Sequence, residues 1–466
     1  MALTKEAARE EFDVEKLLED EQAWLRAVAL NYTPRSPVGR PMHPDRVRQL
    51  LANRPKPLEC PVRRCQCAPP DIIFKGPLSG VAVGAGKGRP IGGRLRLFTD
   101  RFRSAGYPDL ADALQGGIPW RQEFVSLVPA VFENAPSCTK YQDFVDAEVQ
   151  ALLEVNAIAE LPLGQLPVAC VGLYVADDNL KKLQLVYDAR YINHCDGTGA
   201  IILKGIESIK HFIRKGEWMV KTDVRSGYPH LPLRDKDLVY MCFHWRGRIY
   251  HWACMPFGIR SAPRWFVAAT RPVAAAIGKE LAVPFLLWID DLHALLGTNL
   301  EEAKVKFEKI KEIWTRFGFV LAVEKLEGPA TRVESLGCIV DSVLMIIQLA
   351  EKRICKIRNR AELLAGAQEV VARDVAVFAG VMNAADMGLK WGRRMAYPAY
   401  DLIRWIDPLR LTSTRVTVSD RLRLVTSWIK EKWDSLHGRP ICDPAPRWAT
   451  VSDSTPRRWA DRKSVV

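Results

Sequence analysis

The sequence predicts an α+β fold. Short apolar segments that read as strands and hairpins recur between residues 166 and 349, and amphipathic segments with helical periodicity alternate with them. From about residue 350 the pattern becomes helical and basic. The chain has 466 residues, enough for about two to four domains, and its hydrophobic share of 48% is that of a globular protein.

Composition limits which cellular environment and which kinds of binding partner are consistent with the sequence. Lysine and arginine number 67 against 54 acidic residues, a formal charge of +13 that is consistent with a polyanionic partner. No run of about eighteen uncharged apolar residues exists, so we expect no membrane span. Eleven cysteines without a signal-peptide pattern indicate reduced thiols inside a cell, with nucleus and cytoplasm both open.

The first part of the chain carries no clear chemistry. Residues 1–30 have an amphipathic helical pattern, and residues 31–95 are rich in Pro, Gly and Arg, which predicts an extended or mobile linker. The segment "GVAVGAGKGRP" lacks the first glycine and the Ser or Thr of a phosphate-binding loop. A cluster of possible metal ligands consists of Cys60, Cys65 and Cys67, with His43 upstream. Two interpretations stay open: the cluster binds zinc, or it is part of an irregular loop.

The ordered part is predicted to start by about residue 136. A helix over 143–155 places four apolar side chains on one face and stops at Asn156. Two strands around an Asp-Asp-Asn turn follow within 166–193. A short strand then runs into Asp223, and a Pro-Phe-Gly bend precedes a helix that starts near Ser261.

The next elements surround a pair of acids. An apolar hairpin contains Asp290 and Asp291, and a capping box of Thr298 and Glu301 opens a helix that ends at Gly318. That helix places Ala303, Phe307, Ile310, Trp314 and Phe317 on one face. A further hairpin is expected to turn at residues 341–342.

Three acids at strand ends carry the functional signal. Asp223, Asp290 and Asp291 lie in or beside apolar strands, where an unpaired carboxylate is costly. Two magnesium ions about 3.5–4 Å apart need carboxylates from more than one strand, and such a pair aligns a hydroxyl and stabilises a leaving pyrophosphate. The pattern therefore indicates nucleotidyl transfer.

Six motifs, in order and at matching spacings, resemble the reverse transcriptases of retroelements. "KKLQLVYDARYIN" resembles the fingers motif, "KTDVRSGYPHLPL" the first aspartate motif, and "MPFGIRSAPRWF" the Pro-Phe-Gly motif. "WIDDL" resembles the Tyr-x-Asp-Asp box, "FGFVLAVEKLE" the Gly-Phe…Lys motif, and "VESLGCIV" the primer grip. The resemblance runs from about residue 115 to the C-terminus and implies a right-hand polymerase of fingers, palm and thumb, with an antiparallel palm sheet covered by helices on one face.

The wording of later motifs is similar to DIRS-type (tyrosine-recombinase) retrotransposon polymerases. "GLKWGRRMAYPAYDLIRW" and "HGRPICDPAPRWATVSDS" resemble the stretches that follow the thumb in that group. Asp453 would then be the first acid of a ribonuclease H domain, but only thirteen residues follow it, against the roughly 50 a small domain needs. We expect that nuclease to be absent, or to belong to a longer or degraded reading frame.

The resemblance implies roles at the catalytic centre. Asp223 and Asp290 would bind two Mg²⁺ ions, or Mn²⁺, with help from the backbone carbonyl of Val224, and Asp291 would support them. Tyr228 would lie beneath the sugar and reject a ribose 2′-hydroxyl. The nucleotide-binding residues would be Lys181, Lys182, Arg190, Tyr228, Phe257, Gly258 and Lys325, the last beside the departing pyrophosphate.

The resemblance also implies how a template–primer duplex of RNA or DNA and the dNTPs are held. Leu336 and Gly337 would grip the primer end. Basic residues of the thumb would follow the duplex by its phosphates and shape, namely Lys352, Arg353, Lys356, Arg358 and Arg360. The implied segments are an N-terminal extension over 1–115, fingers and palm over 116–350, a helical thumb and connection over 351–445, and the nuclease-like start over 446–466.

Three residues depart from the family wording, and two alternatives stay open. Trp288 replaces the Tyr of the acidic box, Gln184 replaces an Arg of the fingers motif, and Pro229 follows Tyr228 where His or Phe is common. One alternative is a non-catalytic remnant that only binds nucleic acid. The other is an RNA-directed RNA polymerase, against which Tyr228 and the "MPFG" motif argue.

Overall fold

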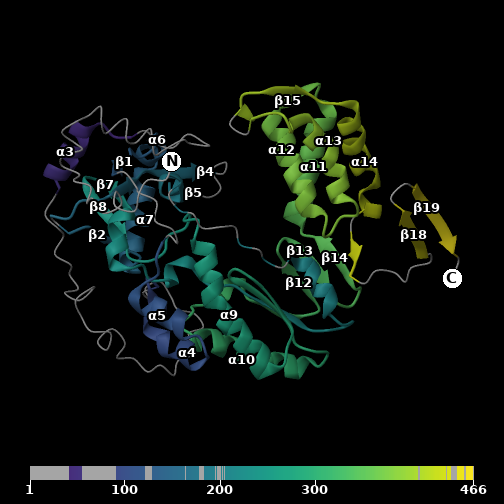
Figure 1. Cartoon of the computed structure of the whole chain (residues 1–466), viewed down its shortest axis with the longest axis horizontal. Coiled ribbons are helices and arrows are strands. Elements are labelled where there is room, and N and C mark those ends of the chain that lie inside the picture. The colour runs from purple at the N-terminus through teal and green to yellow at the C-terminus, as the bar shows by residue number, and fades with distance from the viewer. Residues whose placement is uncertain are drawn as a thin grey trace. The chain divides into compact units, whose positions relative to one another are not determined.

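The structure is a computed structural model, and its described residues are 41–54, 91–120, 129–162, 164–177, 183–194, 196, 201, 203, 205–407, 410–436, 438–441, 449–455 and 458–464. The predicted helix over 1–30, the glycine-rich stretch at 80–90 and the three cysteines of the zinc hypothesis lie outside them. The chain forms two compact units (Figure 1). The first comprises Met1–Leu203, Thr222–Leu292 and Val305–Leu326, and the second comprises Lys204–Lys221, His293–Lys304 and Glu327–Val466.

The first unit contains a five-stranded sheet in the order β1-β3-β7-β8-β2. Its strands are β1 (Ala130–Val131), β2 (Ile158–Glu160), β3 (Ala169–Val171), β7 (Cys242–Trp245) and β8 (Arg248–Trp252). β3 runs parallel to β1 and β7, while β8 is antiparallel to β7 and β2. The β7–β8 hairpin turns at Arg246 and Gly247, whose φ values of 48° and 74° are those of a type I′ turn. The rings of Phe243 and Tyr250 stack across this hairpin at 5.4 Å.

A separate hairpin of the same unit confirms part of the predicted two-strand motif. β4 (Leu173–Asp177) pairs antiparallel with β5 (Leu183–Tyr187), and α8 (Arg190–His194) follows. The sequence analysis did not separate β3 from β4, because both are apolar and a single residue, Gly172, lies between them. A side chain at Gly172 would meet the carbonyl oxygen of Glu133 at 2.4 Å, so the backbones there approach too closely for any other residue.

The helices of the first unit confirm several predictions. They include α4 (Thr99–Ser104), α5 (Pro108–Gly116), α6 (Pro136–Lys140), α7 (Gln142–Glu154), α8 and α9 (Ala262–Leu281), together with most of α10 (Leu300–Arg316). The predicted apolar face of α10 is buried, and the helix is followed by Gly318 at φ 91°, as expected of a C-terminal glycine. α7 ends before Asn156, which adopts φ 55°.

Two expectations were wrong. The capping box of Thr298 and Glu301 does not form, because Asn299 caps α10: its Oδ1 accepts from the backbone nitrogens of Glu301 at 2.9 Å and Glu302 at 3.2 Å. Order also begins earlier than about residue 136, because α3 (Pro44–Ala52), α4 and α5 are helical. The Phe102 ring of α4 packs edge-on against Phe317 at 5.2 Å, so these short helices are held by contact with residues distant in the sequence.

The predicted acidic segments lie on a four-stranded sheet in the order β11-β6-β10-β9. Its strands are β6 (Met219–Thr222), β9 (Phe285–Trp288), β10 (Asp291–Leu295) and β11 (Glu327–Ala330). β11 is antiparallel to β6, with Glu327 opposite Lys221. The backbone nitrogen of Leu296, just beyond β10, donates to the carbonyl of Trp218, just before β6, at 2.8 Å. The expected palm-like antiparallel sheet is therefore present.

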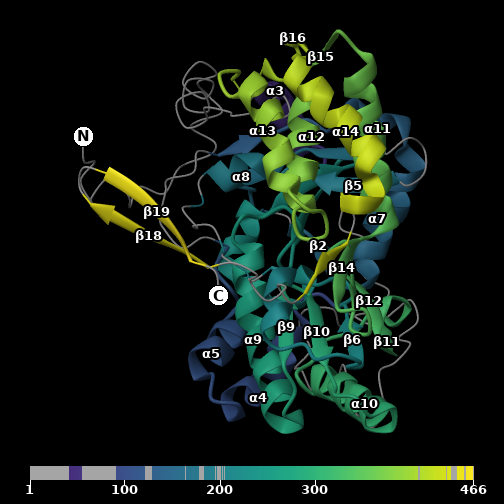
Figure 2. The ribbon, with the colours of Figure 1, turned by 90° about the vertical axis from the view of Figure 1, so that its right-hand side faces the viewer.

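The second unit contains an antiparallel sheet and the predicted helices. The sheet runs β12 (Arg332–Ser335), β13 (Cys338–Asp341), β14 (Ile346–Leu349) and β17 (Arg439–Pro440). Helices α11 (Glu351–Gly366), α12 (Ala372–Ala385), α13 (Gly392–Ile403) and α14 (Asp420–Leu436) lie side by side in both ribbon views (Figures 1 and 2). The short strands β15 (Glu369–Val371) and β16 (Arg415–Thr417) pair at the end of the bundle.

The last described residues form a two-stranded hairpin of β18 (Ala449–Thr455) and β19 (Arg458–Ser464) (Figure 2). The nuclease-like role expected for Asp453, which lies in β18, stays a prediction. Among the residues that the structure describes, no helix combines the length and the apolar character needed to cross a membrane.

Candidate functional site

The tip of the β9–β10 hairpin presents two of the three predicted acids. Ile289 and Asp290 form the turn between the strands, and Asp291 begins β10. Ile289 adopts φ 55°, a conformation that costs a β-branched residue about 1–3 kcal/mol. The hydroxyl of Thr270, on α9, donates to the Ile289 carbonyl at 3.2 Å and so stabilises the turn. The adjacent carboxylates are therefore held on a short, strained connection rather than on a free loop.

Asp223 follows the end of β6 and is 8% exposed. A neighbouring segment fixes its backbone: the nitrogen of Ala322 donates to the Asp223 carbonyl at 2.9 Å, and Val224 forms an antiparallel bridge with Leu321. This pairing brings the segment that leads to Lys325 alongside Asp223. Residues about 100 positions apart in the sequence thus reach the same place through backbone hydrogen bonds.

The ammonium of Lys325 lies among the three acids. Its Nζ donates to both carboxylate oxygens of Asp223 at 3.1 Å. The hydrogen bond that Lys325 donates to Asp223 raises the pKa of Lys325 most, and the negative charges of Asp223, Asp290 and Asp291 raise it further. All three carboxylates therefore lie near enough to this ammonium to raise its pKa. The structure therefore brings together the three acids that the sequence analysis singled out, with Lys325.

The donor set suits a hard divalent cation, although the site is not preassembled for one. Asp223, Asp290 and Asp291 offer carboxylate oxygens from two separate segments, the ligands that Mg²⁺ prefers. Within the part of the chain that the structure describes, no three acidic, histidine or cysteine side chains already converge as a metal cage. Lys325 now supplies the positive charge against Asp223, so cation binding would have to share that carboxylate with the ammonium.

Tyr228 lies beside the acids and the Pro-Phe-Gly loop. Its ring lies 5.0 Å from that of Phe257 and 5.5 Å from that of Phe266. Burial raises the pKa of the Tyr228 phenol, and the charge of Asp290 raises it further, so the phenol stays protonated near Asp290 at neutral pH. Pro229 does not prevent a tight local fold, since Tyr228–His230 forms one 3₁₀ turn.

His230 orients the loop that carries Tyr228, and the sequence analysis missed it. The ring is fully buried; its Nε2 accepts from the backbone nitrogen of Val320 at 3.1 Å, and its Nδ1 lies 3.0 Å from the Gly227 carbonyl. This arrangement requires a neutral ring with the proton on Nδ1. Burial lowers the pKa of His230 to about 4. No sequence pattern signals the role, because the partners are backbone groups of a distant segment.

The structure describes some, but not all, of the predicted nucleotide-binding residues of the fingers. Gly258 has φ 95°, and its carbonyl accepts from Nδ2 of Asn193 at 2.6 Å, which ties the exposed Phe257 loop to α8. Arg190 forms a two-pronged ion pair with the carboxylate of Asp188, at 2.7 and 2.6 Å. Lys181 and Lys182 lie outside the described residues.

The predicted primer grip is the turn of the β12–β13 hairpin. Leu336 and Gly337 have φ values of 51° and 70°, both left-handed, as a type I′ turn requires. Arg353 of α11 donates from Nη2 to the Leu336 carbonyl at 3.1 Å and from Nη1 to the Ala384 carbonyl at 3.2 Å. The expected contact of Arg353 with nucleic acid stays a prediction, but its observed contacts fix the hairpin turn.

The other basic residues of α11 also divide into two groups. The guanidinium of Arg358 lies 5.1 Å from the centre of the Trp433 ring, and Arg360 pairs with Asp374. Lys352 and Lys356 are exposed. For all five residues the expected contact with phosphates stays a prediction.

Comparison with a protein family identifies the domain that carries this site. Residues 180–340 match the family model for reverse transcriptase (RNA-dependent DNA polymerase). The matched span contains Asp223, Asp290, Asp291 and Lys325. The chain therefore carries a reverse transcriptase domain.

Viral polyproteins are similar to parts of the chain. A putative enzymatic polyprotein of Cassava vein mosaic virus is 22% identical over 188 residues, which cover 39% of this chain and 28% of the relative. The Pro-Pol polyprotein of Simian foamy virus type 1 is 25% identical over 156 residues, covering 34% of this chain and 13% of the relative. The match thus spans less than a third of either relative.

Solved structures share the fold. The foamy viral protease–reverse transcriptase in complex with an RNA/DNA hybrid has a TM-score of 0.55 at 14% identity, over 79% of this chain and 50% of that one. The same foamy viral protein with double-stranded DNA also has a TM-score of 0.55, at 13% identity, over 82% and 79% of the two chains. At this identity the likeness establishes the right-hand polymerase fold that the sequence analysis expected.

We predict that His230 makes the stability of the first unit depend on pH. Its folded-state pKa is depressed, so its contribution is complete above the unfolded value of about 6.5 and is lost as pH falls toward 4. The stability difference between wild type and His230→Phe, measured by urea unfolding, should shrink by about 3 kcal/mol from pH 7 to pH 4. The control is His211→Phe, at an exposed position. A pH-independent difference for His230→Phe would contradict this account.

We also predict that the acids control the reactivity of Lys325. Asp223→Asn removes the strongest cause of its raised pKa, so labelling of Lys325 by acetic anhydride at pH 9 should accelerate, about tenfold for each unit by which the pKa falls. Asp290→Asn should give a smaller acceleration in the same direction. Lys304, paired with Glu301, is the internal control in peptide mass spectra. No response to Asp290→Asn would mean that Asp290 does not share the site.

Proposed function

We propose that this protein is an RNA-directed DNA polymerase that adds deoxynucleotides to a primer. One observation carries the proposal: Asp223, at the end of β6, and Asp290 and Asp291, at the β9–β10 turn, act together on the Lys325 ammonium within a reverse transcriptase domain. A purely structural role for three acids near one ammonium is unattractive, since like charges repel and burial of a carboxylate costs hydration. Nucleotidyl transfer would explain the three acids, because its divalent cations need carboxylate ligands.

The site residues would have different roles in the reaction. Two magnesium ions, or manganese, held by Asp223 and Asp290 with the Val224 carbonyl, would supply Lewis-acid stabilisation of the attacking and leaving oxygens. Asp291 supports that centre. Lys325 stays an ammonium at neutral pH because the acids raise its pKa, so it is suited to donate a proton to, or to neutralise, the departing pyrophosphate.

Substrate selection would fall to the aromatic cluster. The Tyr228 ring, held between Phe257 and Phe266, would lie beneath the incoming sugar and clash with a ribose 2′-hydroxyl. Phe257 and Gly258 would contact the nucleotide and template, with Arg190, Lys181 and Lys182 on the triphosphate side. The Arg190 side chain pairs with Asp188 and is 41% exposed.

The partner would be a template–primer duplex. The foamy viral neighbours were solved with an RNA/DNA hybrid and with double-stranded DNA, which supports the same class of ligand here. Fingers and palm would occupy residues 116–350, and the thumb and connection residues 351–445, after an extension over 1–115 and before a nuclease-like start at 446–466. The motif wording "GLKWGRRMAYPAY" supports an origin in a DIRS-type retrotransposon.

A binding-only remnant is the second candidate. Two observations favour it: Lys325 already neutralises Asp223, and Trp288 stands where the family has Tyr. Against it, all three acids are present, and the charge of each raises the pKa of Lys325. An RNA-directed RNA polymerase is the third candidate, and Tyr228 argues against it because its ring would exclude ribonucleotides.

Primer extension separates the three candidates. On an RNA template with magnesium, wild type should extend a DNA primer with dNTPs, and Asp290→Ala should reduce the rate by at least about a thousandfold, because a metal ligand contributes several kcal/mol of transition-state stabilisation. Asp237→Ala, which removes a buried carboxylate paired with Arg234 away from the site, is the matched control and should stay active if the variant folds. Removal of magnesium with EDTA should stop extension by wild type.

Three results would contradict the proposal. Extension that survives in Asp290→Ala would place the chemistry elsewhere. Template binding without extension by wild type would favour the remnant. A preference for rNTPs would favour the RNA polymerase.

Duplex binding tests the thumb. Lys352→Gln with Lys356→Gln should reduce the slope of log affinity against log salt by about 0.9 for each phosphate that the variant no longer neutralises. Lys279→Gln, an exposed lysine on α9, is the control. The slope should be unchanged in the control; an unchanged slope in the double variant would remove these two lysines from the duplex interface.

A further inference from the structure

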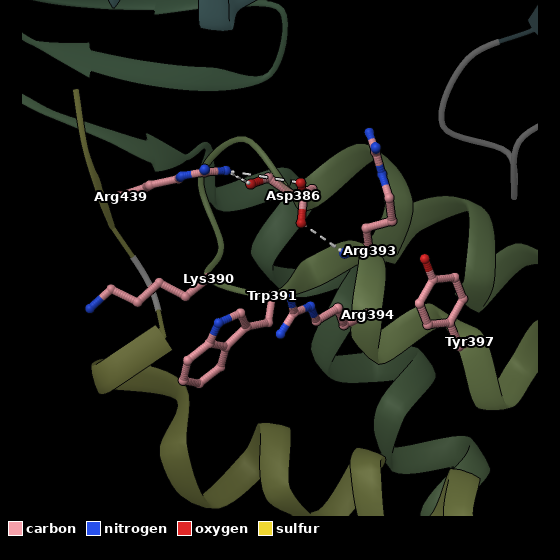
Figure 3. A pocket seen from close by; sticks show the side chains of 7 residues that line it. All are labelled: Asp386, Lys390, Trp391, Arg393, Arg394, Tyr397 and Arg439. Atoms are coloured by element: carbon pink, nitrogen blue, oxygen red, sulfur yellow. Dashed lines mark hydrogen bonds and ion pairs between the residues drawn. The ribbon is translucent and has the colours of Figure 1, made fainter. Parts of the chain in front are cut away.

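A basic pocket in the second unit lies outside the catalytic machinery. It has a volume of about 350 Å³, in the range of a site for a nucleotide-sized ligand, and is formed by the α12–α13 connection, the start of α13 and β17. Its lining residues are Asp386, Lys390, Trp391, Arg393, Arg394, Tyr397 and Arg439 (Figure 3). In this view Lys390, Trp391 and Arg394 lie in a row, with Arg439 and Asp386 above it.

The pocket has an excess of positive charge. Four of its side chains are cationic and one is acidic. Asp386 is already engaged: Arg439 donates to its backbone carbonyl at 3.1 Å and lies 3.9 Å from its carboxylate, which accepts from the backbone nitrogen of Arg393 at 2.9 Å. Among the described residues, no carboxylate forms an ion pair with Lys390 or Arg394. These two exposed cations therefore favour an anion from outside.

Two exposed aromatic side chains accompany those cations. Trp391 is 53% exposed and Tyr397 is 52% exposed. The Trp391 ring is stacked on Trp428 of α14 at 6.0 Å with an interplanar angle of 25°, so it is backed on one side. Trp391 also has φ 60°, a costly conformation for a large side chain, which places the ring at the start of α13. A supported aromatic ring beside such cations is the combination that binds an unpaired base and its phosphates.

We propose that this pocket binds a segment of single-stranded nucleic acid, with a base on Trp391 and the adjoining phosphates on Lys390 and Arg394. A duplex would use the cations but would keep its bases stacked, and would gain nothing from the indole ring. A free phosphate or polyphosphate would likewise need the cations alone. The inference rests on the nucleic-acid binding of the proposed function, not on catalysis.

The test compares three probes on the full chain by fluorescence anisotropy: a labelled 16-nucleotide single strand, a blunt duplex of the same sequence, and inorganic polyphosphate as competitor. Trp391→Ala should weaken single-strand binding about 5- to 100-fold and leave duplex binding and polyphosphate competition unchanged. Trp391→Phe should restore most of the affinity. Lys390→Gln with Arg394→Gln should lower the salt slope for the single strand by about 0.7 for each phosphate that the variant no longer neutralises.

Matched controls separate the pocket from general effects. Trp405→Ala removes a tryptophan that is 85% exposed, also lies beside an arginine and does not line the pocket. Lys430→Gln removes an exposed charge of α14. Neither should alter single-strand affinity or its salt slope by more than about twofold. Circular dichroism and thermal melts of each variant check that the helical bundle stays folded.

The outcomes are decisive in both directions. Equal weakening of single-strand and duplex binding in Trp391→Ala would overturn the proposal, and so would unchanged single-strand binding in both pocket variants of a folded protein. Single-strand binding that depends on Trp391 in an Asp290→Ala protein would uphold it. If wild type binds the single strand in this way but extends no primer, the inference stands and the polymerase proposal fails.

Discussion

The repulsion among three carboxylates is the constraint on which the site depends. Asp223 is buried, Asp290 and Asp291 are half-buried, and all three act on Lys325, an arrangement that disfavours folding unless positive charge is near. Lys325 supplies that charge. Two features of the backbone hold the acids in place, the strained turn at Ile289 and the pairing of Val224 with Leu321. A fold that maintains such a concentration of negative charge is suited to cations arriving with a nucleotide.

The sequence predicted the parts of this site that follow from local pattern. Acids interrupting apolar strands identified Asp223 and the Asp290–Asp291 pair, and helical periodicity identified the buried face of α10. Contacts that depend on residues far along the chain were not predicted. The His230 ring accepts a hydrogen bond from the backbone of Val320, and Arg353 donates to the Leu336 carbonyl. Neither partner lies within the short window of sequence that local pattern reasoning considers.

Charge alone does not show which basic residues of α11 contact other side chains of the protein. Arg358 and Arg360 lie on the same helix as Lys352 and Lys356, and they contact Trp433 and Asp374 of neighbouring helices. The sequence "GLKWGRRMAYPAY" did not predict a pocket, and only the structure gathers Lys390, Trp391 and Arg394 around one hollow. Long cations are ambiguous in sequence, because a guanidinium serves equally well in packing and in phosphate binding.

Cleavage of the backbone by bound iron tests the shared centre most directly. With Fe²⁺ in place of magnesium, plus ascorbate and peroxide, hydroxyl radicals cut the chain next to the ion, and mass spectrometry maps the cuts. Our account predicts two groups of cuts, near Asp223 and near Asp290, which both disappear with excess Mg²⁺ and both weaken in Asp223→Asn. Cuts confined to one of the two segments, or insensitive to that substitution, would mean that the acids do not hold a common cation.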